Sequence, residues 1–195
     1  MSDRQVAELQ AEIAACTICA EHLPLGPRPV VQFSPRSRIL IIGQAPGTKV
    51  HASGTPWDDD SGDRLRGWLG LEKPEFYDPD CVALMPMGFC YPGKAKGGDA
   101  PPRKECAPAW HEHILDLLPE NRLTLLVGAY AQAAYLPEAR RLSLTERVRR
   151  GPEFAPFLPL PHPAWRVRVW MTKQRWFEAE TLPRLRSLVT TSLTG

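Results

Sequence analysis

Short apolar runs alternate along the chain with longer amphipathic segments. The apolar runs cover residues 37–43, 81–87, 123–128 and 157–160. Uninterrupted apolar runs of this length are typical of parallel strands that are buried on both faces. Apolar residues recur at helical spacing over residues 6–18, 61–69, 105–118, 129–136, 143–148 and 172–188. Ser61 or Asp60 is the expected cap of the second of these helices. Strands that alternate with helices predict an α/β sandwich with a mostly parallel sheet of about four strands.

Length and composition fit one globular domain over residues 1–195. Hydrophobic residues make up 43% of the chain and charged residues 24%, close to the average for globular proteins. No apolar run approaches the roughly 20 residues that a bilayer requires, and the polar start of the chain does not look like a signal peptide. These observations predict a cytoplasmic protein with no membrane partner. A net charge of +2 does not by itself indicate a polyanionic partner, although the arginines of the C-terminal half could form either a phosphate-binding surface or a solvated helix face.

Ligands of parallel α/β sheets bind beyond the carboxyl ends of the strands, where this chain has unusual loops. The loop after the first strand reads Gly43-Gln44-Ala45-Pro46-Gly47 and then reaches Trp57. Its glycines and prolines allow a tight backbone close to a ligand, Gln44 can donate and accept hydrogen bonds, and Trp57 offers a flat face for stacking. This combination suits a planar polar ring such as a nucleobase. The spacing matches neither a phosphate-binding P-loop nor a dinucleotide fingerprint.

These motifs resemble the uracil-DNA glycosylase superfamily, and particularly its bacterial and archaeal iron-sulfur branch, family 4. The family motif Gly-Glu-Ala-Pro-Gly is similar to residues 43–47, and its Gly-x-Pro-Phe is similar to residues 54–57, with Gln44 for Glu and Trp57 for Phe. A second signature, a His-Pro pair after the last strand, is matched by His162-Pro163. The resemblance extends over roughly residues 16–170. It implies a three-layer α/β/α sandwich with a central four-stranded sheet, and a monomeric enzyme that releases free uracil from single- or double-stranded DNA.

The resemblance also implies roles for particular residues. Trp57 would stack on the flipped base, and His162 would hydrogen-bond the uracil oxygen on which negative charge develops. Gln44 would hold the base or the attacking water, and either Asp59 or Asp60 would orient that water. The complete base-binding set is Gly43, Gln44, Ala45, His51, Trp57 and Met87, and the catalytic set is Gln44, Asp59, Asp60 and His162. The DNA-binding set is Arg64, Lys94, Lys96, Arg103, Trp165 and Arg166, of which the lysines lie in a glycine-rich segment that could equally be a plain surface loop.

The sequence departs from the family at two positions. Pro86 stands where the family usually has an Asn that reads the uracil edge, so base recognition would fall to the backbone around Met87 or to His51. After His162-Pro163, the usual small polar residues are replaced by a segment that contains Trp165 and Arg166, which would serve as an apolar wedge and a phosphate contact.

Four of the five cysteines have spacings similar to the cluster ligands of the iron-sulfur glycosylases. Cys16 and Cys19 form a Cys-x-x-Cys pair, and Cys90 and Cys106 follow around the second loop. The resemblance therefore implies a structural [4Fe-4S] cluster held by these four residues. A zinc ion on the same thiolates, or packed thiols without a metal, are the alternatives. Cys81 lies within the second predicted strand and is expected in the core.

Two other functions compete with uracil excision. The missing Asn at Pro86 suggests a protein that keeps the fold and the pocket but binds damaged or abasic DNA with little or no turnover. A cysteine-metal protein unrelated to DNA is a third possibility, which salt-independent behaviour towards nucleic acid would support.

Overall fold

A computed structural model describes residues 3–195. The strands of the central sheet are β1 (Ile39–Ile42), β2 (Val82–Leu84), β5 (Leu123–Val127) and β6 (Phe157–Leu160), and a separate hairpin consists of β3 (Lys94–Ala95) and β4 (Gly98–Asp99). The helices are α1 (Asp3–Ala14), α2 (Thr48–Ser53), α3 (Asp60–Leu69), α4 (Lys73–Phe76), α5 (Cys106–Leu115), α6 (Ala129–Tyr135), α7 (Leu144–Arg149), α8 (Val167–Lys173) and α9 (Leu182–Thr194). Short 3-10 turns cover Ala20–His22, Pro137–Ala139 and Gly151–Phe154, and a π-helical turn covers Phe177–Thr181.

The central sheet has the order β2-β1-β5-β6, and each neighbouring pair is parallel. Successive residues of β1 point to opposite faces, so that Ile39 and Ile41 belong to one hydrophobic core and Leu40 and Ile42 to the other. All four are fully buried, which explains why β1 reads as an unbroken apolar run.

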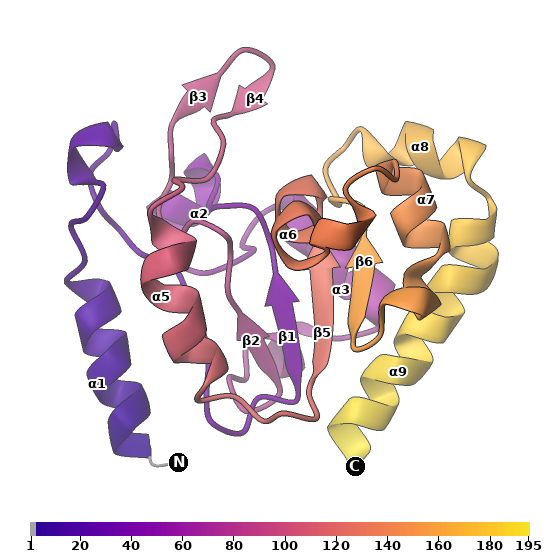
Figure 1. The fold of residues 1–195 in the computed structure, drawn as a ribbon, viewed down its shortest axis with the longest axis horizontal. Coiled ribbons are helices and arrows are strands. Elements are labelled where there is room, and N and C mark those ends of the chain that lie inside the picture. The colour runs from indigo at the N-terminus through magenta and orange to yellow at the C-terminus, as the bar shows by residue number, and fades with distance from the viewer. Residues whose placement is uncertain (1–2) are drawn as a thin grey trace.

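Helices cover both faces of the sheet (Figure 1). Apolar residues of α3 and α9 pack with one face, and those of α1, α5 and α6 pack with the other. The predicted three-layer α/β/α sandwich is therefore confirmed, with a four-stranded sheet that is entirely parallel. The carboxyl ends of the strands point towards the hairpin and the segment that precedes α8, so both segments lie at the same end of the sheet.

Two predicted helices have different bounds. The first ends at Ala14 rather than residue 18, because the apolar stripe of Val6, Leu9 and Ile13 stops there and Ile18 is 58% exposed. The predicted helix over residues 172–188 is wrong as a single helix. It is interrupted after α8, where Gln174 leaves the helical region (φ −116°, ψ 61°), and it resumes as the π-helical turn that runs into α9. Pro183, which has no N–H, lies where the π-helical turn gives way to α9.

Smaller differences have local causes. The cap of α3 is Asp59, whose Oδ1 accepts a hydrogen bond from the Gly62 N–H at 2.8 Å, and not Ser61 or Asp60. Strand β2 ends at Leu84, two residues before Pro86, which cannot donate to a ladder. Helices α2 and α4 and the hairpin were not predicted from the sequence. Within residues 3–195, no helix has the length and apolar character needed to cross a membrane.

Candidate active site

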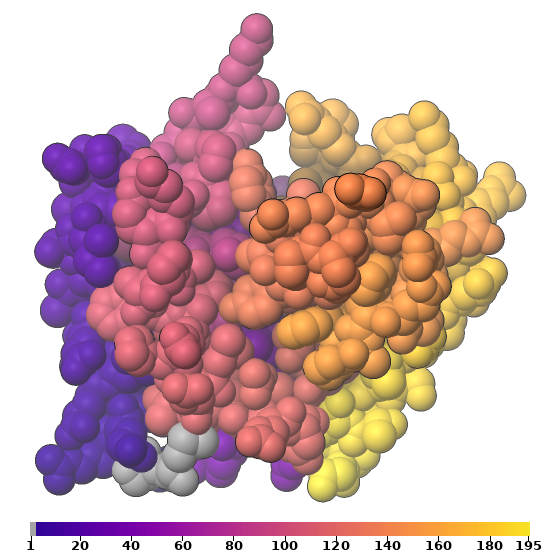
Figure 2. Space-filling view, in the orientation of Figure 1, coloured from indigo at the N-terminus to yellow at the C-terminus, as the bar shows by residue number. Residues whose placement is uncertain are grey.

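A cleft of about 470 Å³ opens at the carboxyl ends of the sheet, a volume typical of small-molecule sites. Figure 2 shows the hairpin standing apart from the segment that precedes α8, with a hollow between them. The lining comes from the loops after β1, β2 and β6 and from the hairpin, and includes Gly43, Gln44, Ala45, Pro46, Gly47, Trp57, Asp59, Pro86, Lys94, Asp99, His162, Trp165 and Arg166. Residues far apart in the sequence therefore share one cavity.

Residues 43 and 44 line the cleft and are hydrogen-bonded through their backbone to the chain that follows β2. The Met87 N–H donates to the Gly43 carbonyl at 2.9 Å, and the Gly88 N–H donates to the Gln44 carbonyl at 3.0 Å. These two bonds hold residues 43 and 44 beside Pro86, which also lines the cleft. Met87 contributes through its backbone, and its side chain does not line the cleft.

Trp57 is held in place by its backbone and by close packing. It has a φ of 56°, a left-handed conformation that is unusual for a bulky residue. A Cβ at Gly62 would stand 1.7 Å from the Trp57 carbonyl oxygen, so only glycine fits there. The same oxygen accepts hydrogen bonds from Arg66 Nη1 and from the Tyr77 hydroxyl, each at 3.4 Å. The indole lies over Gly43, where a Cβ would stand 2.8 Å from Cζ2. A backbone fixed in this way supports a pre-organised stacking surface.

His162 faces the indole of Trp57. Their ring centroids are 5.7 Å apart, and the rings are inclined by 33°. Gly128, which has a φ of +90°, allows this approach, because a Cβ there would lie 3.3 Å from His162 Cβ. Burial lowers the pKa of His162 below its usual value of 6.5, although the negative charges of Asp59 and Asp99 partly oppose this. The imidazole is therefore neutral at pH 7, and no group of residues 3–195 hydrogen-bonds its ring.

The two aspartates that the sequence analysis left open occupy different positions. Asp59 lines the cleft, and its Oδ2 lies 4.0 Å from the point where a Gly47 Cβ would stand. Asp60 does not line the cleft. Its side chain is 86% exposed and pairs with Lys49 at 3.0 Å, which holds the pKa of its carboxyl below the usual range. The geometry therefore favours Asp59 as the carboxylate that acts in the cleft.

The predicted DNA-binding residues divide between the cleft and its surroundings. Lys94, Trp165 and Arg166 line the cleft, and Trp165 is 69% exposed with the Arg166 guanidinium 5.3 Å from its ring. Arg64 lines a neighbouring hollow and donates to the Pro163 carbonyl. Lys96 lies in the exposed hairpin turn but does not line the cleft.

Arg103 and His51 lie away from the cleft. Arg103 pairs with Glu105, with 2.6 Å between Nη2 and Oε1, beside the cysteines. His51 lies on α2, and its ring centroid is 6.0 Å from that of Tyr91. Asp99, which the sequence analysis did not select, does line the cleft. The only feature of the sequence that could have indicated this role is that Asp99 lies in the glycine-rich segment. Its place in the cleft depends on the hairpin.

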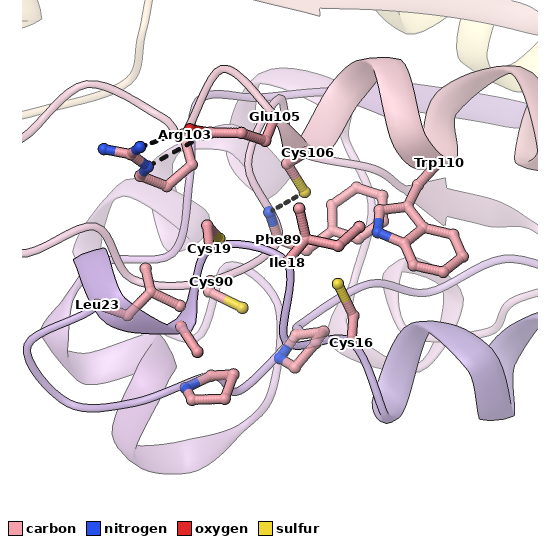
Figure 3. Close-up of a pocket in the computed structure, with 13 residues that line it drawn as sticks. Cys16, Ile18, Cys19, Leu23, Phe89, Cys90, Arg103, Glu105, Cys106 and Trp110 are labelled. Atoms are coloured by element: carbon pink, nitrogen blue, oxygen red, sulfur yellow. Dashed lines mark hydrogen bonds and ion pairs between the residues drawn. The ribbon is translucent and has the colours of Figure 1, made fainter.

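The four cysteines of the predicted cluster surround a second cavity on the α1 side of the molecule (Figure 3). Cys16 and Cys19 come from the loop after α1, Cys90 follows the cleft-lining segment after β2, and Cys106 begins α5. The remaining wall is mostly apolar, and the Phe89 N–H donates to Cys106 Sγ at 3.3 Å. Cys81, predicted in the core of the second strand, instead precedes β2 and is only partly buried, packed against the edge of the core.

Burial in this apolar surrounding raises the pKa of the Cys90 thiol to about 11 and that of Cys106 to about 12. All five cysteines are free thiols. Across the described residues 3–195, no group of three or more His, Cys, Asp or Glu side chains is arranged to hold a metal ion. The four predicted ligands are thus gathered around one cavity.

The carboxyl ends of a parallel α/β/α sandwich here carry an aromatic ring, a neutral histidine and a carboxylate, an arrangement that can accept a planar polar ring. Residues 30–186 match the family model of the uracil DNA glycosylase superfamily. This match covers most of the chain, which therefore belongs to that superfamily of DNA repair glycosylases.

Proposed function

We propose that this protein hydrolyses the N-glycosidic bond of uracil in DNA and leaves an abasic site. The observation that carries the proposal is the pairing of Trp57 and His162, 5.7 Å apart between ring centroids, in a cleft that Asp59 also lines. A flipped base needs a flat surface for stacking and a hydrogen-bond donor at the oxygen that becomes negative. Trp57 and His162 supply these two groups from different loops.

His162 suits the role of a neutral donor. When the bond between C1′ and the base nitrogen breaks, its electron pair leaves with the base, and negative charge develops on a uracil oxygen. An N–H of the neutral imidazole can hydrogen-bond that oxygen in a water-poor site, where such bonds are strong. The ring has no competing partner among residues 3–195, and it therefore needs no rearrangement before it donates.

Asp59 suits a role at the sugar, where water attacks and positive charge develops. Its Oδ1 is engaged at the start of α3, which fixes the carboxyl group and leaves Oδ2 directed towards Gly47. A fixed carboxylate can orient the attacking water and attract the sugar as it becomes cationic. Water then adds to C1′ and releases a proton, which balances the charge on the departing base.

The decisive experiment measures uracil release from labelled single- and double-stranded oligonucleotides. We expect excision by the wild-type protein and a loss of about 100-fold or more in His162→Ala, as for other groups that stabilise developing negative charge. His113→Ala is a matched control, because His113 is exposed on α5, away from the cleft. The absence of uracil release by the wild type at high protein concentration would overturn the proposal, as would equal activity of both variants.

A second candidate function is slow-turnover binding of damaged or abasic DNA. Pro86 favours it, because it lines the cleft where the resemblance places a base-reading Asn, and its side chain has no hydrogen-bonding group. Nanomolar binding of abasic DNA by the wild type without measurable base release would favour this function over excision.

We propose further that Cys16, Cys19, Cys90 and Cys106 hold a structural [4Fe-4S] cluster. The support is their shared apolar cavity and the backbone N–H that donates to Cys106 Sγ, since clusters of this type take one thiolate per iron and accept hydrogen bonds at sulfur. The cluster would tie the loop after α1 to the segment after β2, and hydrolysis needs no electron transfer from it.

The test is anaerobic purification followed by absorption spectroscopy and iron and sulfide analysis. We expect about four irons and four sulfides per chain, lost in Cys90→Ser and retained in Cys81→Ser. Zinc in their place, or no metal in anaerobically purified protein, would contradict the cluster.

For partners, we propose that Lys94 and Arg166 contact DNA phosphates and that Trp165 enters the duplex beside the flipped base. Both basic residues line the cleft, and the indole is 69% exposed. Since one chain provides the whole cleft, we propose that the monomer is the working form, which light scattering with and without DNA would test.

A further inference from the structure

The hairpin brings a charged residue to the cleft from outside the central sheet. Strands β3 and β4 pair antiparallel, with Lys94 opposite Asp99 and Ala95 opposite Gly98. The hairpin projects beyond the carboxyl ends of the sheet (Figure 1), and Lys94, Gly97, Gly98 and Asp99 contribute to the lining of the cleft.

The carboxylate of Asp99 has one engaged oxygen and one directed towards the floor of the cleft. Its Oδ1 lies 2.6 Å from Lys94 Nζ, which fixes the side chain across the hairpin. Its Oδ2 lies 3.4 Å from the point where a Cβ of Gly47 would stand. The side chain is only 33% exposed, half the value for Lys94, and is thus the inner member of the pair.

Asp59 also approaches this point. Its Oδ2 lies 4.0 Å from the Cβ position of Gly47, and its Oδ1 is held by the Gly62 N–H. Two carboxylates from unrelated segments, each fixed through one oxygen, therefore direct the other oxygen to the backbone at Gly47. The negative charges of both carboxylates also oppose the lowering of the His162 pKa that burial causes.

We propose that Asp99 is a second catalytic carboxylate, which faces the sugar and stabilises the positive charge that forms at C1′ as the glycosidic bond breaks. This inference rests on the proposed function. The electron pair of the C1′–N bond leaves on the base, C1′ becomes cationic, and water adds there with release of a proton. Asp99 takes no part in proton transfer. It holds negative charge at the place where positive charge develops, in a cleft that partly excludes water.

A purely structural role for Asp99 predicts a different result. If its carboxylate only positioned Lys94 on a phosphate, its loss would weaken all DNA binding equally and would act like the loss of Lys94. A charge that faces the sugar must instead distinguish a cationic from a neutral sugar.

The experiment compares two oligonucleotides at fixed ionic strength, one with a cationic pyrrolidine abasic analogue and one with a neutral tetrahydrofuran analogue. Asp99→Asn removes the charge but keeps an oxygen for Lys94. We expect the wild type to prefer the pyrrolidine, and Asp99→Asn to lose that preference by roughly tenfold. Lys94→Gln should weaken both complexes by similar factors, and Asp116→Asn, an exposed control at the far end of α5, should change neither.

Two results would overturn the inference: no preference for the pyrrolidine in the wild type, or an unchanged preference in Asp99→Asn, which includes equal weakening of both complexes. Uracil release, measured in parallel, should fall in kcat with little change in KM. If the wild type prefers the pyrrolidine but releases no uracil, excision fails as the function while the placement of Asp99 stands.

Discussion

Substitution by alanine should have opposite effects on stability at the two glycines of α3. Gly62 and Gly67 lie in one helix, and alanine is favoured over glycine there by about 1 kcal/mol. At Gly67 a Cβ would meet nothing within 4 Å, so Gly67→Ala should gain roughly 0.4–1 kcal/mol of stability. At Gly62 the Cβ would stand 1.7 Å from the carbonyl oxygen of Trp57, which is backbone and cannot turn away.

The cost at Gly62 follows from what must move. Displacing the Trp57 carbonyl breaks its bonds to Arg66 and Tyr77, each worth about 1 kcal/mol, and disturbs the Asp59 cap, worth about 1 kcal/mol more. Overpacking adds about 1–3 kcal/mol. After the helix-propensity gain, Gly62→Ala should lose about 3–5 kcal/mol, a fall in Tm of roughly 6–20 °C for a chain of this size.

Urea unfolding followed by circular dichroism measures the free energy of unfolding of both variants. Uracil release shows whether Trp57 keeps its position in the cleft. We expect Gly67→Ala to keep full activity and Gly62→Ala to lose most of it even where it is folded, because Trp57 is displaced. If Gly62→Ala were as stable as Gly67→Ala, the close packing that fixes Trp57 would be refuted.

Three further predictions concern the cleft. Asp59→Ala should cost about 1 kcal/mol of stability and most of the activity, whereas Asp60→Ala should change the urea midpoint little because the Asp60 side chain is exposed. Trp57→Phe should keep more activity than Trp57→Ala, since a phenyl ring still stacks; equal losses in single-turnover assays would argue against stacking. Because burial lowers the pKa values of His111 and His162 from 6.5, the unfolded state binds protons more readily, so the free energy of unfolding should fall as the pH drops below about 6.5. A pH titration of the urea midpoint tests this, and His162→Gln should show a smaller fall.

The sheet was predictable because its strands are buried on both faces. Residues Ile39 to Ile42 have no polar position, and that pattern admits few alternatives in a short segment. The interruption after α8 was not predictable from periodicity alone, since the apolar spacing continues through Gln174 while its backbone leaves the helical region.

Only the parts of the candidate site that lie in local sequence motifs could be predicted. The loop at residues 43–47, Trp57 and His162 meet in the cleft as expected from their places after the strands. Asp59 and Asp60 are adjacent in the sequence, and only the turn into α3 directs one to the cleft and the other to solvent. The position of Asp99 in the cleft depends on the pairing of β3 with β4, which are two residues long and have no alternation of apolar and polar residues. The hydrophobic pattern therefore did not indicate that Asp99 lines the cleft.

The hairpin belongs to neither core of the molecule, and this has an evolutionary consequence. Its paired residues are all exposed, so changes in its length or charge would leave the sheet and its packing intact. Apart from Lys94 and Asp99, this segment can therefore change in sequence while Trp57, His162 and Asp59 stay in place. A homologue with a longer or differently charged hairpin could therefore change its preference among single strands, duplexes and unusual nucleic-acid shapes without losing fold stability.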